Sequence, residues 1–241
     1  MGKRNSSEIT MNEILQFLQD LAAHNDRGWF NENKQRYQQA QSKWNEFCLQ
    51  LIHEIGQYDP EIARLTLRDC TYRIYRDTRF SNDKSPFKTH FGVFLAPGGK
   101  KSMHAGYYFH VGTGEGEGYP HAHMLAVGNY CYDPQAVKVL REDICYGWEE
   151  FSQNVLAAAD PRFQPDMEGA LKKVPKGFDP EAPSADWLRM KCYGLSFNVG
   201  NDFLLAPDLA QRVAAIFRTA KPFNDYINRG VDFAKHELRH G

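Results

Sequence analysis

The sequence predicts an α+β fold in which a central, mainly antiparallel sheet is flanked by N-terminal and C-terminal helices. Apolar residues recur at helical spacing toward both ends of the chain, whereas aromatic and β-branched residues alternate with turn signals between residues 70 and 127. Helices that are separated in sequence from a run of strands are typical of the α+β class. Neither a repeat nor a linker divides the 241 residues. We therefore expect a disordered leader at residues 1–8 and a single α+β domain at residues 9–241.

Two helices are expected in the first part of the chain. Thr10 and Glu13 have the spacing of a capping box, and apolar residues at positions 14–21 follow with helical periodicity. A polar interruption comes next. A second, longer helix is expected from about Trp29 to Ile55, with Gly56 as its stop signal.

The middle of the chain carries the strand pattern. Short aromatic and β-branched runs are separated by turns that contain glycine, proline, asparagine or aspartate. We interpret His121 and His123, which lie in a glycine-rich stretch, as exposed polar loop residues and not as metal ligands. The strands are expected at Thr71–Arg79, Phe91–Ala96, Gly106–Val111 and Ala126–Cys131, with a loop at Gly112–His123.

Helices return in the C-terminal half. They are expected at Pro134–Ile144, at Gly147–Ala159 and at Ser184–Lys191, and a last long helix begins near Pro207. Pro222 lies inside the pattern of that last helix. Because proline lacks the N–H that a helix needs, Pro222 should kink or split it.

The composition is that of an ordinary soluble protein. Hydrophobic residues make up 42% and charged residues 24% of the chain, and the net charge is −1. Such a balance gives no global attraction to nucleic acid or to an anionic membrane. The five cysteines are scattered and never spaced as CxxC, and no apolar run is long enough to span a bilayer. We therefore expect a cytoplasmic protein with no membrane partner.

The segment Tyr72–His90 holds the densest chemistry. It contains five fixed cations and two carboxylates, and five minus two leaves a surplus of three positive charges. Arginine offers bidentate donors and lysine a mobile ammonium, which together suit an oxyanion. The ligand-binding residues expected here are Arg73, Arg76, Arg79, Lys84 and Lys88.

A second basic segment repeats this chemistry. Residues 172–178 combine cations, a proline and an aromatic ring. We expect Lys176, together with Arg189 and Lys191 further along the chain, to form the opposite wall of the same anion-binding cleft.

Three titratable residues are candidate catalytic groups. Because no nucleophile motif is present, catalysis would be electrostatic and acid–base, with His90, Asp77 and Asp83 as its agents. His110 is a further candidate for the same role. The competing interpretation is structural, in which both carboxylates neutralise neighbouring cations and the histidines are satisfied groups beside aromatic rings. We expect no resident metal and no cofactor.

The junction between the first two expected helices has two interpretations. Asp26 can cap the second helix, and Trp29 can begin its buried stripe. This structural interpretation is the preferred one. The alternative is that Asn25 and Arg27 reach into the anion-binding cleft.

Several motifs resemble those of a conserved family of unknown function that is widespread in bacteria and has fungal members. The similarity covers nearly the whole chain. It departs at His24, where the family usually has asparagine, and at Ala182-Pro183, where it usually has His-Pro. The resemblance implies a self-contained cytoplasmic domain and names no activity. The motifs that carry it are Asn25–Phe30, Tyr75–Lys88 (YRDTRFSNDKSPFK), Tyr107–His110, Leu171–Phe178 (with PKGF) and Trp187–Lys191.

Three functions remain open on the sequence. The leading hypothesis is an enzyme or binding protein for a small phosphorylated or otherwise anionic ligand. The second is a nucleic-acid-binding module or an Mg²⁺-dependent nuclease in which Asp77 and Asp83 hold the metal. The third is a non-catalytic interaction domain. The oligomeric state does not follow from the sequence.

Overall fold

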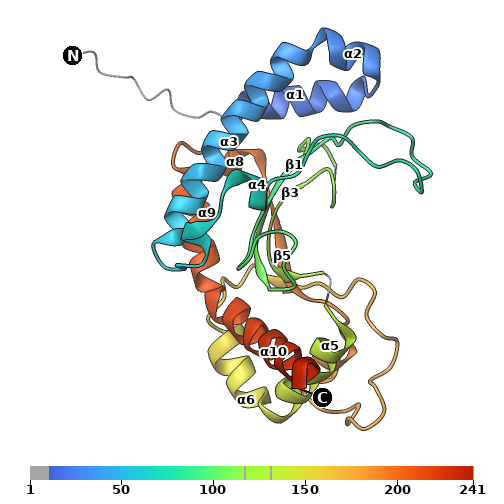
Figure 1. Cartoon of the computed structure of the whole chain (residues 1–241), viewed down its shortest axis with the longest axis vertical. Coiled ribbons are helices and arrows are strands. Elements are labelled where there is room, and N and C mark those ends of the chain that lie inside the picture. Colours follow the sequence, from blue (N-terminus) through green and yellow to red (C-terminus); the bar gives the residue numbers. More distant parts are fainter. Residues whose placement is uncertain (1–10, 117, 131, 241) are drawn as a thin grey trace. The chain divides into compact units, whose positions relative to one another are not determined.

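The computed structural model describes residues 11–116, 118–130 and 132–240 (Figure 1). The predicted leader at residues 1–8, and Thr10 of the predicted capping box, lie outside this range. The described residues form helices toward both ends of the chain and an antiparallel five-stranded sheet of order β1-β2-β3-β5-β4. The predicted α+β fold is confirmed.

The described residues form two compact units. The first holds the described chain up to Val93, together with Phe109–Met124 and Asn198–Ala214. The second holds Phe94–Tyr108, Leu125–Phe197 and the described chain from Ala215 onward. Each unit is described below by itself. The single domain expected from the sequence stays a prediction.

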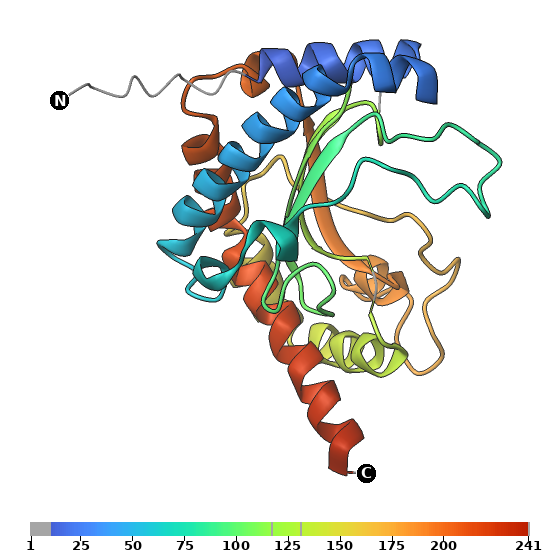
Figure 2. The same cartoon turned by 45° about the horizontal axis from the view of Figure 1, so that its top comes forward.

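The helices of the first unit begin with α1 (Asn12–Ala23), α2 (Arg27–Glu32) and α3 (Lys34–Gly56), coloured blue in Figure 2. The one long helix predicted from Trp29 is thus two helices. Asn33 leaves the helical conformation between them, with φ −100° and ψ 18°. Shorter helices follow: a 3₁₀ turn at Ile62–Arg64, α4 (Leu67–Cys70) and α8 (Asn201–Leu204).

Aromatic packing forms the core of the first unit. The apolar face of α1 lies against α3, and Trp44 of α3 is almost completely buried. The Trp44 ring stacks on Phe91 at a centroid distance of 5.7 Å and on Phe109 at 6.3 Å. Rings of this size each bury a large apolar area, so these contacts hold α3 firmly against Phe91 and Phe109.

The sheet holds β1 (Phe91–Leu95), β2 (Gly106–Val111), β3 (His123–Asn129), β4 (Gln164–Pro165) and β5 (Tyr193–Val199). Sequence analysis placed the first three, although β3 begins three residues before the predicted start, and Cys131 at its predicted end lies outside the described residues. It missed β4 and β5, which pair antiparallel with Gln164 opposite Ser196. The strand predicted at Thr71–Arg79 was wrong, because only single bridges form there.

The second unit is rich in helices: α5 (Pro134–Tyr146), α6 (Trp148–Glu150), a π-helix at Phe151–Leu156 and α7 (Ala185–Arg189). At the C-terminal end, α9 (Leu209–Thr219) and α10 (Lys221–His240) are separate helices. The predicted split near Pro222 is therefore confirmed, with the proline in the first turn of α10, where a missing N–H costs little.

Close packing joins α10 to α5, and the two helices cross near the C-terminal end of the chain in Figure 1. Gly230 lies at their crossing, where a Cβ atom would come within 2.6 Å of Leu140 Cδ2. Asn228 of α10 accepts the N–H of Ala105 at 2.7 Å and donates to its carbonyl at 3.1 Å. One amide side chain thus satisfies both backbone groups of the residue that precedes β2.

Candidate functional site

The segment at residues 71–90, which we name the motif hairpin, doubles back on itself before β1. Tyr75 pairs antiparallel with Phe87. On either side of this pair, the Arg76 N–H donates to the Pro86 carbonyl at 3.0 Å and the Lys88 N–H donates to the Ile74 carbonyl at 2.8 Å. The chain has the course of a hairpin without a continuous ladder, so side chains carry much of its stabilisation.

Asn25, between α1 and α2, clamps the motif hairpin. Its Nδ2 donates to the Phe87 carbonyl at 3.0 Å, and its Oδ1 accepts the Phe87 N–H at 3.1 Å. The Phe87 ring stacks on Phe30 of α2 with centroids 3.9 Å apart. Asp26 caps α2 by accepting the Trp29 N–H at 3.0 Å. Asp26 thus has the expected structural role, and Asn25 reaches the motif hairpin, while an anion-binding role of Asn25 and Arg27 stays a prediction.

A pocket of about 540 Å³, named here the hairpin pocket, lies between the motif hairpin and the start of α2. Three cations line it: Arg27 beside the clamp, and Arg76 and Lys84 from the hairpin. One carboxylate, that of Asp26, also lines it. Aromatic rings and neutral polar groups complete the wall, from Asn25, Phe30, Asn31, Tyr75, Thr78, Pro86 and Phe87.

The two motif carboxylates each pair with an arginine of the hairpin. Asp77 accepts two guanidinium hydrogen bonds from Arg79, at 3.0 and 2.6 Å, and these lower the pKa of Asp77. Asp83 accepts the hydroxyl and the N–H of Ser85 at 2.6 and 2.9 Å, and it also pairs with Arg76. The Ser85 hydrogen bonds and then Arg76 hold the pKa of Asp83 well below its usual range. These contacts are those of the structural alternative.

The cations of the motif lie in different places. The side chain of Arg79 is 77% exposed and forms no part of the hairpin pocket lining, whereas Lys84 lines the pocket and donates to the Thr78 carbonyl at 3.0 Å. Lys88 is half-buried with its ammonium 5.3 Å above the ring of Tyr72. The sequence grouped Arg79 with the lysines as ligand-binding residues, but in the described structure Arg79 turns to Asp77.

The candidate acid–base residue His90 lies in a cluster of three rings with His110 and Tyr119, named here the histidine cluster. The ring centroids of the two histidines are 4.6 Å apart, and those of His90 and Tyr119 are 5.2 Å apart. His90 Nε2 is 3.2 Å from the Tyr119 hydroxyl. The Nε2 of His110 lies 3.0 Å from the Pro120 carbonyl, which can only accept, so this nitrogen carries the proton.

Both histidines of the cluster are neutral near pH 7. Burial, followed by His110, Lys88 and Arg76, lowers the pKa of His90 to about 3. Burial likewise lowers the pKa of His110 to about 4, against a raising effect of the hydrogen bond to Pro120. A neutral imidazole is the form that a general base requires, but pKa values this far below 7 make both rings weak bases.

The basic residues of the second segment belong to the second unit. Arg189 of α7 forms an ion pair at 2.7 Å with Asp186, three residues earlier, and its carbonyl accepts the N–H of Leu171. Lys176 and Lys191 are exposed. Their expected role as an opposite wall of the cleft stays a prediction.

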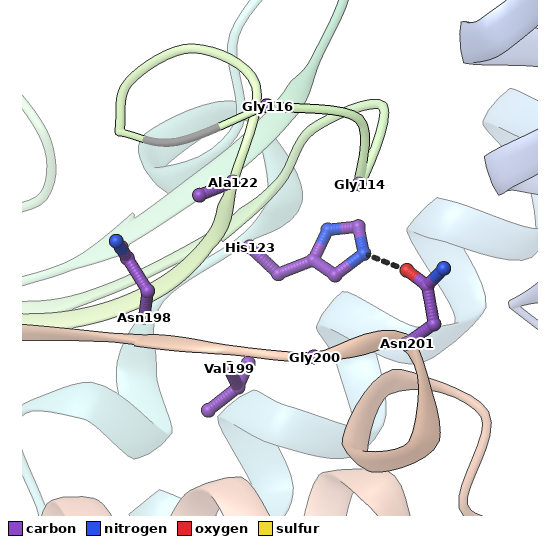
Figure 3. A pocket seen from close by; sticks show the side chains of 8 residues that line it. All are labelled: Gly114, Gly116, Ala122, His123, Asn198, Val199, Gly200 and Asn201. Carbon is purple, nitrogen blue, oxygen red and sulfur yellow. Dashed lines mark hydrogen bonds between the residues drawn. The ribbon is translucent and has the colours of Figure 1, made fainter.

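A second, smaller pocket of about 250 Å³ surrounds His123 at the start of β3 (Figure 3). His123 is buried, not an exposed loop residue as interpreted from the sequence. Its Nδ1 accepts the Gly112 N–H at 3.2 Å, and its Nε2 lies 2.8 Å from Asn201 Oδ1. Gly114 closes the pocket at φ +70°, where a Cβ would lie 2.5 Å from that same oxygen.

The His123–Asn201 pair was not expected from the sequence, and Asn25 and Arg27 line the hairpin pocket. The His121-x-His123 spacing was a signal for the His123–Asn201 pair, because this spacing fits a strand as well as a loop. Groups of three or more histidine, cysteine, aspartate and glutamate side chains placed to hold a metal ion are absent from the described residues. Within the same residues, no helix has both the length and the apolar character needed to cross a bilayer.

These features define an α+β protein with a cationic pocket on a clamped hairpin. The chain belongs to the family described as conserved hypothetical protein (DUF2461), which matches residues 13–226. The resemblance to a conserved family of unknown function is thereby confirmed. No curated protein and no solved structure matches the chain.

Proposed function

We propose that the protein is an enzyme or binding protein for a small phosphorylated or otherwise anionic ligand, which it holds in the hairpin pocket. The observation that supports this most is the charge of the pocket lining. Arg27, Arg76 and Lys84 contribute three positive charges against the one carboxylate of Asp26, and that carboxylate is engaged as a helix cap. Arg76 also pairs with Asp83 from outside the lining, so three cations minus two carboxylates leaves a surplus of one, which an anion such as a phosphate group offsets.

The size and the walls of the pocket favour a ligand with a flat or apolar part as well. A volume of about 540 Å³ falls within the range typical of small-molecule sites. Phe30 and Phe87 form a stacked aromatic pair in its wall, and Tyr75 lies beside them. Phe30 and Phe87 are buried against each other, whereas the ring of Tyr75 is 51% exposed and can hold a planar group by its face while the cations hold the anionic group.

The first experiment is a thermal-shift screen at constant ionic strength with inorganic phosphate, sulfate, sugar phosphates and nucleoside phosphates. Ligands that bind only the folded chain raise the melting temperature. For an anion that does so, the Lys84→Ala and Arg27→Ala variants are expected to bind about tenfold more weakly, because each loses a charge-assisted hydrogen bond.

The matched control is Arg64→Ala, since Arg64 is exposed and pairs with Glu61 in a short helix away from the pocket lining. Its affinity for the same anion is expected to equal that of the unsubstituted chain. A chain whose melting temperature responds to no anion, or whose anion affinity is the same in all three variants, contradicts the proposal.

A second candidate function, nucleic-acid binding, is favoured by one observation at the tip of the hairpin. Phe80 is 95% exposed, and the Arg79 guanidinium lies 5.7 Å from its ring centroid. An exposed ring beside a cation is suited to stack a base and contact a phosphate. This candidate predicts single-strand binding that weakens steeply with salt and with Phe80→Ala, whereas ligand binding in the hairpin pocket does not depend on Phe80.

A further inference from the structure

The half-buried ammonium of Lys88 has a second cation, Arg73, near it. Arg73 lies close enough to act on it, and burial followed by Arg73 lowers the pKa of Lys88. Among the described residues, neither Lys88 nor Arg73 forms an ion pair with a carboxylate. The ring of Tyr72 beneath Lys88 offsets only part of the cost of removing the charge from water.

His90 follows Lys88 by two residues and lies within its electrostatic reach. The charge of Lys88 acts on the His90 ring, so the two side chains lie near each other. None of Lys88, His90 and Tyr119 belongs to the lining of the hairpin pocket. The two regions share only Arg76, which lines the pocket and also acts electrostatically on His90.

One nitrogen of the His90 ring forms no hydrogen bond with the described residues. Its Nδ1 is buried and has no hydrogen-bond partner within the described part of the chain, while its Nε2 faces the Tyr119 hydroxyl. A buried polar atom without a partner carries a cost that a ligand can remove. Tyr119, whose hydroxyl meets the Nε2 edge of this ring, is 64% exposed.

We propose that Lys88, His90 and Tyr119 form a second, proton-coupled binding site for a small oxyanion such as sulfate or phosphate. The anion accepts a hydrogen bond from the Lys88 ammonium beside His90 Nδ1, while the Tyr119 hydroxyl stays at Nε2, where it accepts from the imidazolium. His90 takes up one proton from solvent as the anion binds and then donates to it, so the added positive charge is balanced by the bound anion. This site is independent of the hairpin pocket, in which lysine and arginine bind without a change of protonation.

The groups that face His90 decide how it responds to pH. They are His110 from β2, Lys88 and Arg76 from the hairpin, and Tyr119 from the loop before β3. All the charges among them are positive or neutral, and they hold His90 neutral until an anion arrives. An anion reverses the sign of the local potential and thereby favours the imidazolium.

The test is a calorimetric titration of the full chain with potassium sulfate at constant ionic strength. It is run at about pH 5.5 in two buffers of different ionisation enthalpy, a pH at which an ordinary imidazole is mostly charged and His90 is not. The binding heats in the two buffers are expected to differ by an amount that corresponds to roughly half to one proton taken up per sulfate.

Three variants assign the proton and the site. His90→Gln is expected to abolish the proton uptake, and Lys88→Met to weaken this proton-coupled binding about tenfold. His110→Gln is the matched control, since glutamine keeps a donor for the Pro120 carbonyl, and the proton uptake is expected to remain. Lys84→Met reports on the hairpin pocket alone and is expected to leave the proton uptake unchanged.

Imidazole nitrogen chemical shifts of the unsubstituted chain provide a second readout that needs no variant to fold. Sulfate is expected to move the His90 nitrogens from the neutral to the imidazolium range. The inference is overturned if they stay neutral at saturating sulfate, or if proton uptake is the same in His90→Gln. Failure of the hairpin pocket has a different signature, namely an anion affinity that Lys84→Met leaves unaltered.

Discussion

The motif hairpin and the basic segment at residues 171–191 carry the same kinds of side chain, yet their cations have different surroundings. In the hairpin, Arg76 and Lys84 line a pocket whose other wall comes from the start of α2. In the segment, Arg189 pairs with Asp186 of its own helix, and Lys176 is exposed. The comparison teaches that charged residues clustered in the sequence form ion pairs with one another in both regions. A pocket needs in addition a long-range contact that brings up a second wall.

That contact is the Asn25 clamp, and removing it gives the largest expected effect. In Asn25→Leu the N–H and carbonyl of Phe87 lose their partners, which we expect to lower the free energy of unfolding by about 2 to 4 kcal/mol. Anion binding in the hairpin pocket is expected to weaken with it. Urea denaturation measures the first and the thermal-shift response the second.

Asn31→Ala is the control for the clamp, because Asn31 lines the same pocket as an exposed residue of α2. It should change the free energy of unfolding by less than about 0.5 kcal/mol. Equal losses in the two variants would show that the clamp has no special part in holding the hairpin.

The region of the histidine cluster and residues 171–191 should contribute differently to the pH dependence of stability, since residues 171–191 contain no histidine. The unfolded chain binds protons at His90 and His110 near pH 6.5, but the folded chain binds them only near the lowered pKa values of about 3 and about 4. The unfolded state therefore gains protons first as the pH falls below 6.5. Stability is unaffected above this value and declines below it, by up to about 1.4 kcal/mol per pH unit for each histidine.

Urea denaturation at a series of pH values down to about pH 4 measures this decline. In His90→Gln the free energy of unfolding should fall less steeply with pH in that window, since one of the two histidines that bind a proton only in the unfolded chain is gone. A curve of unchanged slope would mean that His90 binds its proton in the folded chain as easily as in the unfolded one.

The smallest expected effect concerns the two arginines that pair locally. Arg79→Ala and Arg189→Ala each break an ion pair with a carboxylate of the same segment, and neither residue lines the hairpin pocket. We expect both to leave the anion affinity of the pocket within about twofold of the unsubstituted chain. A tenfold loss of anion affinity in Arg79→Ala alone would show that Arg79 binds the anion together with the lysines, as expected from the sequence.

Local patterns accounted for most of the fold. Apolar periodicity located α1, α5 and the strands β1 and β2, and Pro222 marked the boundary between α9 and α10. The pattern failed where long-range contacts decide the structure. Thr71–Arg79 has the composition of a strand but pairs only at single bridges, and on the far side of its partner Phe87 the N–H and carbonyl are bound by the side chain of Asn25 and not by a further strand. No local signal contains that partner.

The same limit applies to the candidate site. The sequence indicated which residues carry charge, and it anticipated that Asp77 and Asp83 can neutralise neighbouring cations. It did not separate Lys84, which lines the pocket, from Arg79, which turns outward, because both lie close together in one turn-rich segment. The burial of His123 depends on Asn201, which is 78 residues away, and so it too lay beyond any local pattern.

The clamp between Asn25 and Phe87 also has a consequence for the order of events in folding. The two residues are 62 positions apart, so their hydrogen bonds close a long loop and form only after the chain entropy of that loop has been lost. Contacts of such separation form slowly compared with the helices on either side. The pocket is therefore expected to be among the last parts of its unit to mature. A peptide that comprises the hairpin alone, without α1 and α2, is expected to remain unstructured and to have no pocket.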